Sequence, residues 1–327
     1  MTEDARAFWV VEPGRGEIRP APLPEPSADD VRVRTLWSGI SRGTESLVFR
    51  GQVPRSEYDT MAAPFQEGHL PGPVKYGYLN VGTVESGPAD LTGRTVFCLF
   101  PHQTEYVVAA TAVIPVPPDV PAERAVLAGT VETAVNVLWD AGPLVGDRVA
   151  VVGAGMVGSC VARLLSQIPG VHVTLVDTNP VRAEVAAAFG VDFAAPDDAP
   201  EGNDFVVHTS ATSAGLTRSL ELLRTDGTVV EASWYGDVQV TLPLGGAFHS
   251  SRLTIRASQV GRVAPARRGS RTHRDRLALA LELLVDPAYD VLLTGSSTFD
   301  ELPETMAAIA SGSLDGLCQT ITYEGEA

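Results

Sequence analysis

The first third of the chain shows the alternation of apolar and polar residues that is typical of β-strands. Residues 31–36 alternate with a period of two, and further short apolar or β-branched runs follow, bounded by Gly, Pro or Asp. These runs lie at residues 81–85, 95–100 and 105–109. The pattern predicts an antiparallel barrel or sandwich, with polar, glycine- and proline-rich loops at residues 39–45 and 71–78. Binding and catalytic residues are often carried by loops on a rigid scaffold of this kind.

After a proline-rich stretch at residues 117–121 the hydrophobic pattern changes. A helical segment is predicted at 121–141, and strand and helix patterns then alternate. The predicted strands are 148–152, 172–177, 205–209, 228–232 and 253–257, and the predicted helices between them include 156–167 and 180–189. This alternation predicts a parallel sheet that is covered by helices on both faces. Beyond residue 261 we expect a basic loop, helices at 275–285 and 302–310, and a closing strand at 319–323.

The composition narrows the class of protein. A length of 327 residues predicts about two domains. The balance of 24 basic against 40 acidic residues gives a net charge of −16, which disfavours binding to nucleic acid or to an anionic membrane. The three cysteines, Cys98, Cys160 and Cys318, are too dispersed for a disulfide framework or a four-cysteine zinc site. We find neither a signal peptide nor a membrane-spanning run, so a cytoplasmic protein is expected.

A GxGxxG motif directly follows the predicted strand 148–152 and opens the predicted helix after it. Gly153 permits a tight turn, Gly155 lets the backbone approach a pyrophosphate, and Gly158 allows close packing of the helix on the strand. Met156 and Val157 lie in the same turn and belong to the predicted site. The motif predicts a dinucleotide-binding site.

Asp177 ends the next predicted strand, 24 residues after Gly153 (177 − 153 = 24). A carboxylate at this position can accept hydrogen bonds from the adenosine ribose, and its charge would repel a 2′-phosphate. NAD is therefore predicted in preference to NADP. Asp177 could instead act as an N-terminal acid of a helix that starts near Pro180. Arg182 could lie along the adenosine or extend into solvent.

This organisation resembles the medium-chain dehydrogenase/reductase superfamily over nearly the whole chain. The segments that carry the resemblance are residues 38–45, Gly77-Tyr78 to Gly82, Thr133, the glycine motif and residues 254–261. The first two segments are similar to the branch that contains bacteriochlorophyllide a dehydrogenase. The resemblance implies a GroES-like catalytic domain at residues 1–120, a Rossmann NAD-binding domain at 121–261, and a C-terminal return at 262–327 that packs on the catalytic domain.

The resemblance also implies roles for single residues. Arg42 matches a position that contacts the coenzyme pyrophosphate, and Thr133 matches one that touches the nicotinamide. Arg42 could alternatively be a surface arginine, and Thr133 a packing residue of its helix. By analogy with the family we also expect a homodimer formed through the edge strand near residues 253–257.

The expected zinc ligands are missing from this chain. Where zinc-dependent members of the superfamily hold the catalytic metal, the aligned residues here are Ser41, Tyr78 and Gly129. None of them is a competent zinc ligand at neutral pH, and the four-cysteine lobe is also missing. We therefore expect no bound zinc, and another group has to handle the substrate proton.

The candidate proton-handling residues are Ser41, Glu45, Lys75 and Tyr78, followed by Glu132. In one hypothesis Tyr78 exchanges the substrate proton while Lys75, the single lysine of the chain, stabilises its phenolate form. Both groups have ordinary pKa values near 10, and these would have to be lowered for either to act as a base. The alternative is a solvated Lys75 paired with Glu67 or Glu45 and a Tyr78 that is packed for its ring.

Other polar residues have both a functional and a structural interpretation. His69 and His102 could each be a base, although a lone histidine is usually structural. Residues 262–276 contain six arginines and His273. Arg267 and Arg268 could bind an anionic group of the substrate, or the segment could be a solvated loop.

We therefore expect a zinc-independent, NAD(H)-dependent oxidoreductase that transfers a hydride between nicotinamide and a small-molecule alcohol or ketone. One alternative is an NAD(P)H-dependent enone or quinone reductase. Another is a protein that binds a nicotinamide dinucleotide without catalysis.

Overall fold

The computed structural model describes residues 5–323, which form two compact units. One unit comprises the chain up to Gly129 together with the segment from Leu281 onward, and the other comprises Thr130–Ala280. These boundaries lie beyond residues 120 and 261, where the sequence pattern divides the chain. The chain passes from one unit to the other inside helix α3 (Ala128–Ala141) and returns inside helix α8 (His273–Leu283), and not at the proline-rich stretch or at the basic loop.

The first unit is built on two sheets. Within residues 5–323, a four-stranded sheet has the order β2-β1-β5-β4, and a second has the order β16-β17-β3-β6-β7-β9, with β8 also paired to β3. The strands are β1 (Ala5–Glu12), β2 (Arg15–Ala21), β3 (Asp30–Gly39), β4 (Glu67–Gly68), β5 (Val74–Lys75), β6 (Asn80–Ser86), β7 (Thr95–Cys98), β8 (Glu105–Ala109), β9 (Ile114–Pro115), β16 (Leu293–Thr298) and β17 (Cys318–Thr322). Strand β17 pairs antiparallel with β3, so the end of the described chain completes a sheet begun in its first third.

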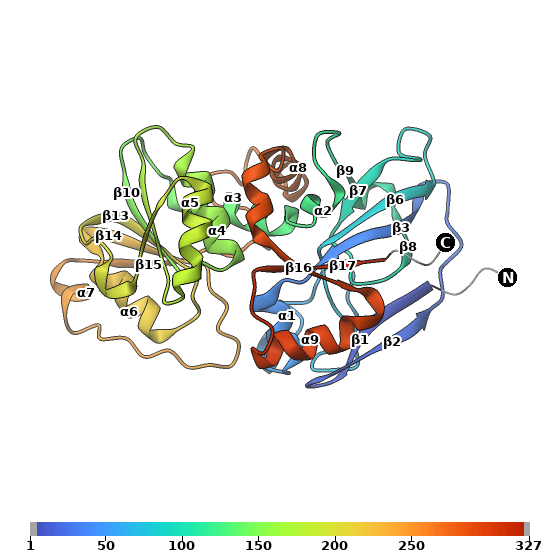
Figure 1. Ribbon diagram of the computed structural model, residues 1–327, viewed down its shortest axis with the longest axis horizontal. Helices are drawn as coiled ribbons and strands as arrows, with labels where there is room; N and C mark the ends of the chain where they lie inside the picture. Colours follow the sequence, from blue (N-terminus) through green and yellow to red (C-terminus); the bar gives the residue numbers. More distant parts are fainter. Residues whose placement is uncertain (1–4, 324–327) are drawn as a thin grey trace. The chain divides into compact units, whose positions relative to one another are not determined.

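The predicted loop at residues 39–45 is wrong in its second half, because helix α1 (Arg42–Phe49) begins there. Ser41 occupies the N-cap position. The Ser41 backbone N–H donates a hydrogen bond to the Glu45 carboxylate at 2.7 Å. An acid in the first helical turn is favourable beside the unpaired N–H groups. The helix then buries Val48 and Phe49. Helix α1 packs beside α9 (Leu302–Ser311), which also contacts β2 (Figure 1).

The second unit contains the parallel sheet that the sequence predicts. Its strand order is β12-β11-β10-β13-β14-β15, and all neighbouring pairs are parallel. The strands are β10 (Arg148–Val152), β11 (His172–Val176), β12 (Asp192–Ala194), β13 (Asn203–His208), β14 (Leu223–Glu231) and β15 (Thr254–Ala257). Residues 149–152 are β-branched or small and are all buried, as expected for a central parallel strand.

Helices cover this sheet. Helix α4 (Met156–Ser166) packs on β10 and β11, α5 (Ala183–Phe189) on β12, and α6 (Ser213–Glu221) on β10, β13 and β14 (Figure 1). The remaining α-helices are α2 (Ala122–Ala125) and α7 (Ala247–Ser250). The 3-10 helices are η1 (Arg55–Glu57), η2 (Ala110–Ala112), η3 (Pro180–Arg182), η4 (Pro196–Asp198), η5 (Pro287–Leu292) and η6 (Phe299–Glu301). Among the residues described, no helix combines the length and the apolar character needed to cross a membrane.

Candidate functional site

The glycine motif forms the turn between β10 and α4. Gly153 has a φ of +107°, which favours glycine over other residues. A Cβ added at Gly158 would lie 1.9 Å from the Gly153 carbonyl oxygen, so the helix can approach the strand this closely only with glycine there. A Cβ at Gly155, in contrast, would have no heavy atom within 4 Å. The first glycine and the third are required by the fold, whereas the second leaves open space.

The N-terminus of α4 fits an anionic group. Gly155 is the N-cap residue and supplies no side-chain acceptor, and the first turn contains no acidic residue. The N–H groups of the first turn, which include those of Met156 and Val157, have no partner within the helix and carry the positive end of its dipole. A pyrophosphate beside Gly155 would satisfy these donors.

Asp177 is hydrogen-bonded to the same turn. Its Oδ2 accepts a hydrogen bond from the Ala154 backbone N–H at 2.7 Å, and its Oδ1 accepts one from the Asn179 N–H at 2.8 Å. A carboxylate has about four acceptor positions, so lone pairs remain for two ribose hydroxyls. Asn179, and not Asp177, caps the short helix η3. Arg182 ends η3 and is partly buried.

The strand order reverses between β10 and β13, because the chain continues outward from β10 on one side and from β13 on the other. Ligands of open parallel sheets bind at the carboxyl ends of the strands beside such a reversal. The glycine turn follows β10 at this point. The second unit therefore has the geometry required to hold a dinucleotide.

The first unit contains a buried chain of hydrogen bonds that starts at Glu45. Its Oε2 lies 2.9 Å from His102 Nε2, and His102 Nδ1 lies 2.6 Å from the Ser38 hydroxyl. The Ser38 hydroxyl lies 2.8 Å from that of Tyr323. All four side chains are buried. A carboxylate, an imidazole and two hydroxyl groups are thus joined in one polar network in an otherwise apolar interior.

Tyr78 and Ser41 are brought together, as expected for neighbours in one site. The Tyr78 hydroxyl donates a hydrogen bond to Ser41 Oγ at 2.6 Å, and Ser41 is in turn held through its backbone N–H by Glu45. Burial raises the pKa of Tyr78 to about 12, and the nearby Glu45 charge acts in the same direction. The Tyr78 hydroxyl is therefore protonated near neutral pH and can act as a proton donor.

The predicted relay between Lys75 and Tyr78 is not formed in this structure. The Lys75 ammonium contacts the carboxylate of Glu67, donates to Gln103 Oε1 at 2.7 Å and lies 5.2 Å from the centroid of the Phe100 ring. Among the hydrogen bonds of the described residues, none joins Lys75 to Tyr78. Burial lowers the pKa of Lys75, and the Glu67 carboxylate partly opposes this shift. The alternative of a Lys75–Glu67 pair is therefore the one observed, with a buried ammonium in place of a solvated one.

The other polar candidates lie in different surroundings. Glu132 is buried in an ion pair, and its Oε1 accepts hydrogen bonds from Arg276 Nε at 3.0 Å and Nη2 at 2.9 Å. It therefore has a structural partner. His69 is exposed. Of the basic segment 262–276, only Arg276 has a buried side chain among the six arginines, and Arg267 and Arg268 are exposed.

Arg42 and Thr133 are placed on helices. Arg42 is the first residue of α1 and Thr133 lies within α3, and both are partly buried. Their coenzyme contacts stay predictions.

The positions of the expected zinc ligands hold no set of metal donors. The hydroxyl groups of Ser41 and Tyr78 bond to each other, and a Cβ at Gly129 would lie 2.5 Å from Leu79 Cδ2. Across residues 5–323, no group of three or more His, Cys, Asp or Glu side chains is arranged to hold a metal ion. The donor set at this position does not fit zinc.

Sequence reasoning did not find Ser38 and Tyr323. Ser38 is 64 positions from His102 and 285 positions from Tyr323, so no local motif links them. Their proximity follows from the pairing of β17 with β3, which a single sequence does not reveal.

Comparison with known proteins supports the fold. No protein-family model matches the chain. An alcohol dehydrogenase of Cupriavidus necator is 24% identical over 301 residues, which is 75% of this chain and 80% of that protein. A structure from Sinorhizobium meliloti, provisionally named a zinc-binding dehydrogenase and bound to NADP, has a TM-score of 0.77 and 16% identity, covering 98% of this chain and 99% of the other.

An alcohol dehydrogenase of Escherichia coli in complex with NADH has a TM-score of 0.76 and 18% identity, covering 98% of this chain and 100% of the other. With these matches the predicted fold class is confirmed: the chain has a GroES-like β-rich domain and a Rossmann domain, the fold of the medium-chain dehydrogenases and reductases.

Proposed function

We propose that this protein is a zinc-independent, NAD(H)-dependent oxidoreductase that transfers a hydride between nicotinamide and a small-molecule alcohol or ketone. The observation that carries the proposal is the turn at Gly155, where open space, an uncapped helix N-terminus and the Asp177 carboxylate lie together. A dinucleotide is the ligand class that needs all three. The likeness to alcohol dehydrogenases, one of them in complex with NADH, supports this proposal.

When bound, a nicotinamide coenzyme supplies or accepts the hydride. The protein then has to move one proton at the substrate oxygen. We assign this role to the Tyr78 hydroxyl, which is protonated near neutral pH and is oriented by Ser41. Glu45 holds the Ser41 backbone N–H through one carboxylate oxygen, and His102 holds Glu45 through the other. In the direction of reduction the Tyr78 O–H, which donates to Ser41 here, would instead donate its proton to the substrate oxygen, leaving a phenolate that takes a proton from solvent. In the direction of oxidation the phenolate form of Tyr78 would accept the alcohol proton, so oxidation should be favoured by alkaline pH.

The coenzyme preference follows from Asp177. Its carboxylate is fixed by two backbone N–H groups and leaves acceptors for the ribose hydroxyls, whereas a 2′-phosphate would be repelled. We therefore propose NAD rather than NADP. An Asp177→Ser variant should lose affinity for NADH and gain relative affinity for NADPH, measured by the fluorescence of the bound nicotinamide. An unchanged ratio of the two affinities contradicts the proposed role of Asp177.

Zinc independence is proposed because of the side chains that replace the expected ligands. Dialysis against a strong chelator, followed by metal analysis and a rate assay, should leave the activity unchanged. Activity that disappears with the chelator and returns with Zn²⁺ overturns this part of the proposal.

The decisive assay combines coenzyme binding with a panel of ketones, alcohols, enones and quinones. Turnover of ketones with NADH supports the proposal. An enone or quinone reductase is the second candidate, because transfer to a conjugated system needs a single proton donor, which the protonated Tyr78 provides. Coenzyme binding without turnover of any class would indicate a non-catalytic binding protein. Failure to bind NADH or NADPH overturns all of these.

Two further expectations stay proposals. An anionic substrate group would be bound by Arg267 and Arg268, which are exposed, although Arg268 Nε also donates to the Val263 carbonyl oxygen at 3.3 Å. Their neutralisation should then raise KM for the substrate. A homodimer would form through β15, one of the two edge strands of the parallel sheet. Light scattering should then give about twice the chain mass of 34.5 kDa, whereas the mass of a single chain contradicts the dimer.

A further inference from the structure

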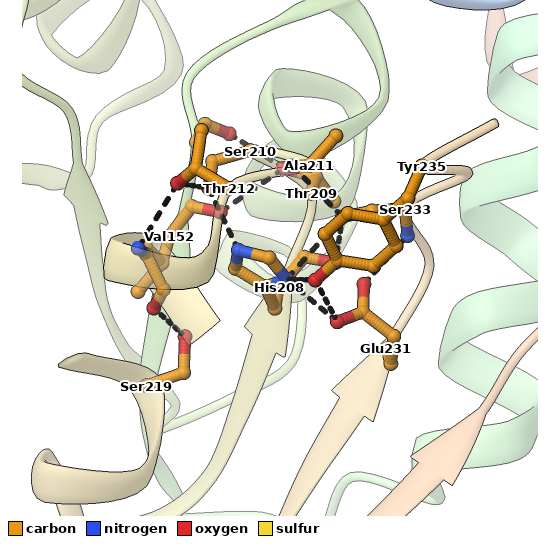
Figure 2. A network of polar contacts seen from close by, with 12 residues as sticks. Val152, His208, Thr209, Ser210, Ala211, Thr212, Ser219, Glu231, Ser233 and Tyr235 are labelled. Carbon is orange, nitrogen blue, oxygen red and sulfur yellow. Dashed lines mark hydrogen bonds and ion pairs between the residues drawn. The ribbon is translucent and has the colours of Figure 1, made fainter. Parts of the chain in front are cut away.

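A second polar network lies in the Rossmann domain, at the carboxyl ends of two neighbouring parallel strands (Figure 2). His208 ends β13 and Glu231 ends β14, and the two residues are paired in the sheet register. His208 Nδ1 lies 2.7 Å from Glu231 Oε2, to which the Tyr235 hydroxyl also donates at 2.9 Å. The His208 side chain is 0% exposed. No motif in the sequence indicates this cluster.

The hydrogen bonds of the cluster change the pKa values of Glu231 and Tyr235. Burial alone would raise the pKa of Glu231, but the hydrogen bonds from His208 and Ser233 outweigh it and the pKa lies below its ordinary value. Burial and the Glu231 charge raise the pKa of Tyr235. Glu231 is therefore an ionised acceptor and Tyr235 a donor near neutral pH.

The same cluster holds the loop that follows β13. His208 Nε2 lies 2.7 Å from Ser210 Oγ, and Ser233 Oγ accepts a hydrogen bond from the Ala211 backbone N–H at 3.1 Å. Ala211 has a φ of +52°, in a region that residues other than glycine rarely adopt. Such a conformation persists only where the surroundings enforce it. The loop from Thr209 to Ala211 is thus fixed from both strands in a strained form (Figure 2).

This loop is packed against the glycine turn. The Thr209 hydroxyl donates to the Gly153 carbonyl oxygen at 2.7 Å, and a Cβ at Gly153 would lie 2.7 Å from the Ser210 backbone nitrogen. The loop therefore stands at the reversal of the strand order, beside the proposed pyrophosphate site. In such a sheet each half binds one mononucleotide, so the half formed by β13–β15 faces the part of the coenzyme that carries nicotinamide.

We propose that His208, Glu231 and Tyr235 are positioning residues that hold the Thr209–Ala211 loop for the nicotinamide mononucleotide half of the coenzyme. This inference rests on the proposed function. The nicotinamide mononucleotide half carries ribose hydroxyls and a carboxamide. A preorganised loop can bind such groups through hydrogen bonds. Ser210 and Tyr235 are partly exposed, so the loop and the cluster reach the surface of the domain.

The test compares two ligands on one set of variants. NADH contains both halves of the coenzyme, whereas ADP contains only the part expected on the side of β10–β12. The variants are His208→Gln, Glu231→Gln and Tyr235→Phe. The matched control is His172→Gln, which changes an exposed histidine at the amino end of β11 in the same sheet. NADH binding is measured by fluorescence and ADP binding by calorimetry.

The three variants should weaken NADH binding by roughly tenfold each, the loss expected for one hydrogen bond that orders the site. ADP binding should change by less than about twofold, and the control should bind both ligands as the parent does. Tyr235→Phe removes a single oxygen atom, so this variant should still fold and can test the inference if His208→Gln does not fold.

Equal losses for NADH and ADP would show that the cluster serves the fold of the sheet as a whole, and would overturn the inference. Unchanged NADH binding in all three variants would overturn it as well. Failure of the parent protein to bind either ligand overturns the proposed function itself, which is a different and recognisable result.

Discussion

The Glu45 carboxylate and the His102 imidazole form a buried pair, with 2.9 Å between Oε2 and Nε2 and side-chain exposures of 4% and 1%. The pair joins helix α1 to the segment before β8. The other carboxylate oxygen holds the Ser41 backbone N–H. Glu45 therefore connects the buried His102 to Ser41, whose hydroxyl oxygen accepts the hydrogen bond from Tyr78.

Removal of this acid should destabilise the protein. In Glu45→Ala, His102 and the Ser41 N–H both lose a buried partner, and we expect the free energy of unfolding to fall by about 3 kcal/mol. Urea denaturation measures the change. The control Glu25→Ala, on an exposed loop, should shift it by less than about 0.5 kcal/mol. Equal effects of the two variants would contradict a structural role for the pair.

Tyr78→Phe should lower kcat by about 10²-fold to 10⁴-fold, because the proposed proton donor is removed. The Kd for NADH should stay the same, since the hydroxyl bonds to Ser41 and not to the glycine turn. Tyr76→Phe is the matched control, because the Tyr76 hydroxyl donates to the Met61 carbonyl oxygen, at 3.4 Å, and not to Ser41. A normal kcat in Tyr78→Phe would remove Tyr78 from the proposed mechanism.

Two glycine substitutions should separate folding from coenzyme binding. Gly155→Ala adds a methyl group to open space, so stability should change by less than about 1 kcal/mol while NADH binding weakens at least tenfold. Gly158→Ala forces a Cβ against the Gly153 carbonyl oxygen and should destabilise the domain by about 1–3 kcal/mol. For each variant, thermal unfolding measures the stability and titration with NADH measures the affinity. Normal NADH affinity in Gly155→Ala would argue against a pyrophosphate at this turn.

Removal of one partner from the buried ion pair of Glu132 and Arg276 should strongly destabilise the protein. Glu132→Ala leaves a guanidinium that is 1% exposed without its carboxylate, and we expect a loss of about 3–5 kcal/mol. Arg267→Ala, on the exposed part of the same segment, should cost less than about 0.5 kcal/mol. Chemical denaturation distinguishes these outcomes, and a mild effect of Glu132→Ala would show that water reaches the pair.

Alkaline pH should destabilise the fold. Burial raises the pKa of Cys98, Cys318 and Tyr78 to about 12, from ordinary values of 9.0 for the thiols and 10.0 for the phenol. Between those values and 12 the unfolded chain binds fewer protons than the folded one, so the free energy of unfolding falls as pH rises. Each group contributes up to about 1.4 kcal/mol per pH unit. Cys98→Ala should give a shallower decline in stability over pH 9–12, and an unaltered slope would contradict this assignment.

The elements of the Rossmann domain were predictable because their signals are local. Strand β10 is a continuous apolar run that ends in the glycine motif, and its predicted and observed bounds agree. Strand β14 starts at Leu223, before the predicted Thr228, because the polar residues 224–226 belong to an exposed extension. Helix α1 was missed since Ser41, Gly43 and Thr44 suggest a loop, whereas the apolar residues that it buries come later.

The candidate sites were predictable only where their residues are contiguous. The glycine turn and Asp177 are found by spacing. Lys75 and Tyr78 are close in sequence, yet their polar groups have different partners. The pair His208–Glu231 depends on β13 and β14 becoming neighbours, and the pair Glu45–His102 depends on helix α1 meeting the segment before β8. A single sequence does not contain that information.

The burial of Lys75 has a practical consequence. It is the single lysine in 327 residues, and its side chain is 2% exposed and engaged by Glu67 and Gln103. Amine-directed reagents therefore find no accessible lysine on the native surface. Acylation of this side chain requires the region around β5 to open, so its rate reports local unfolding in the intact protein. Immobilisation or dye coupling through lysine would consequently select opened molecules.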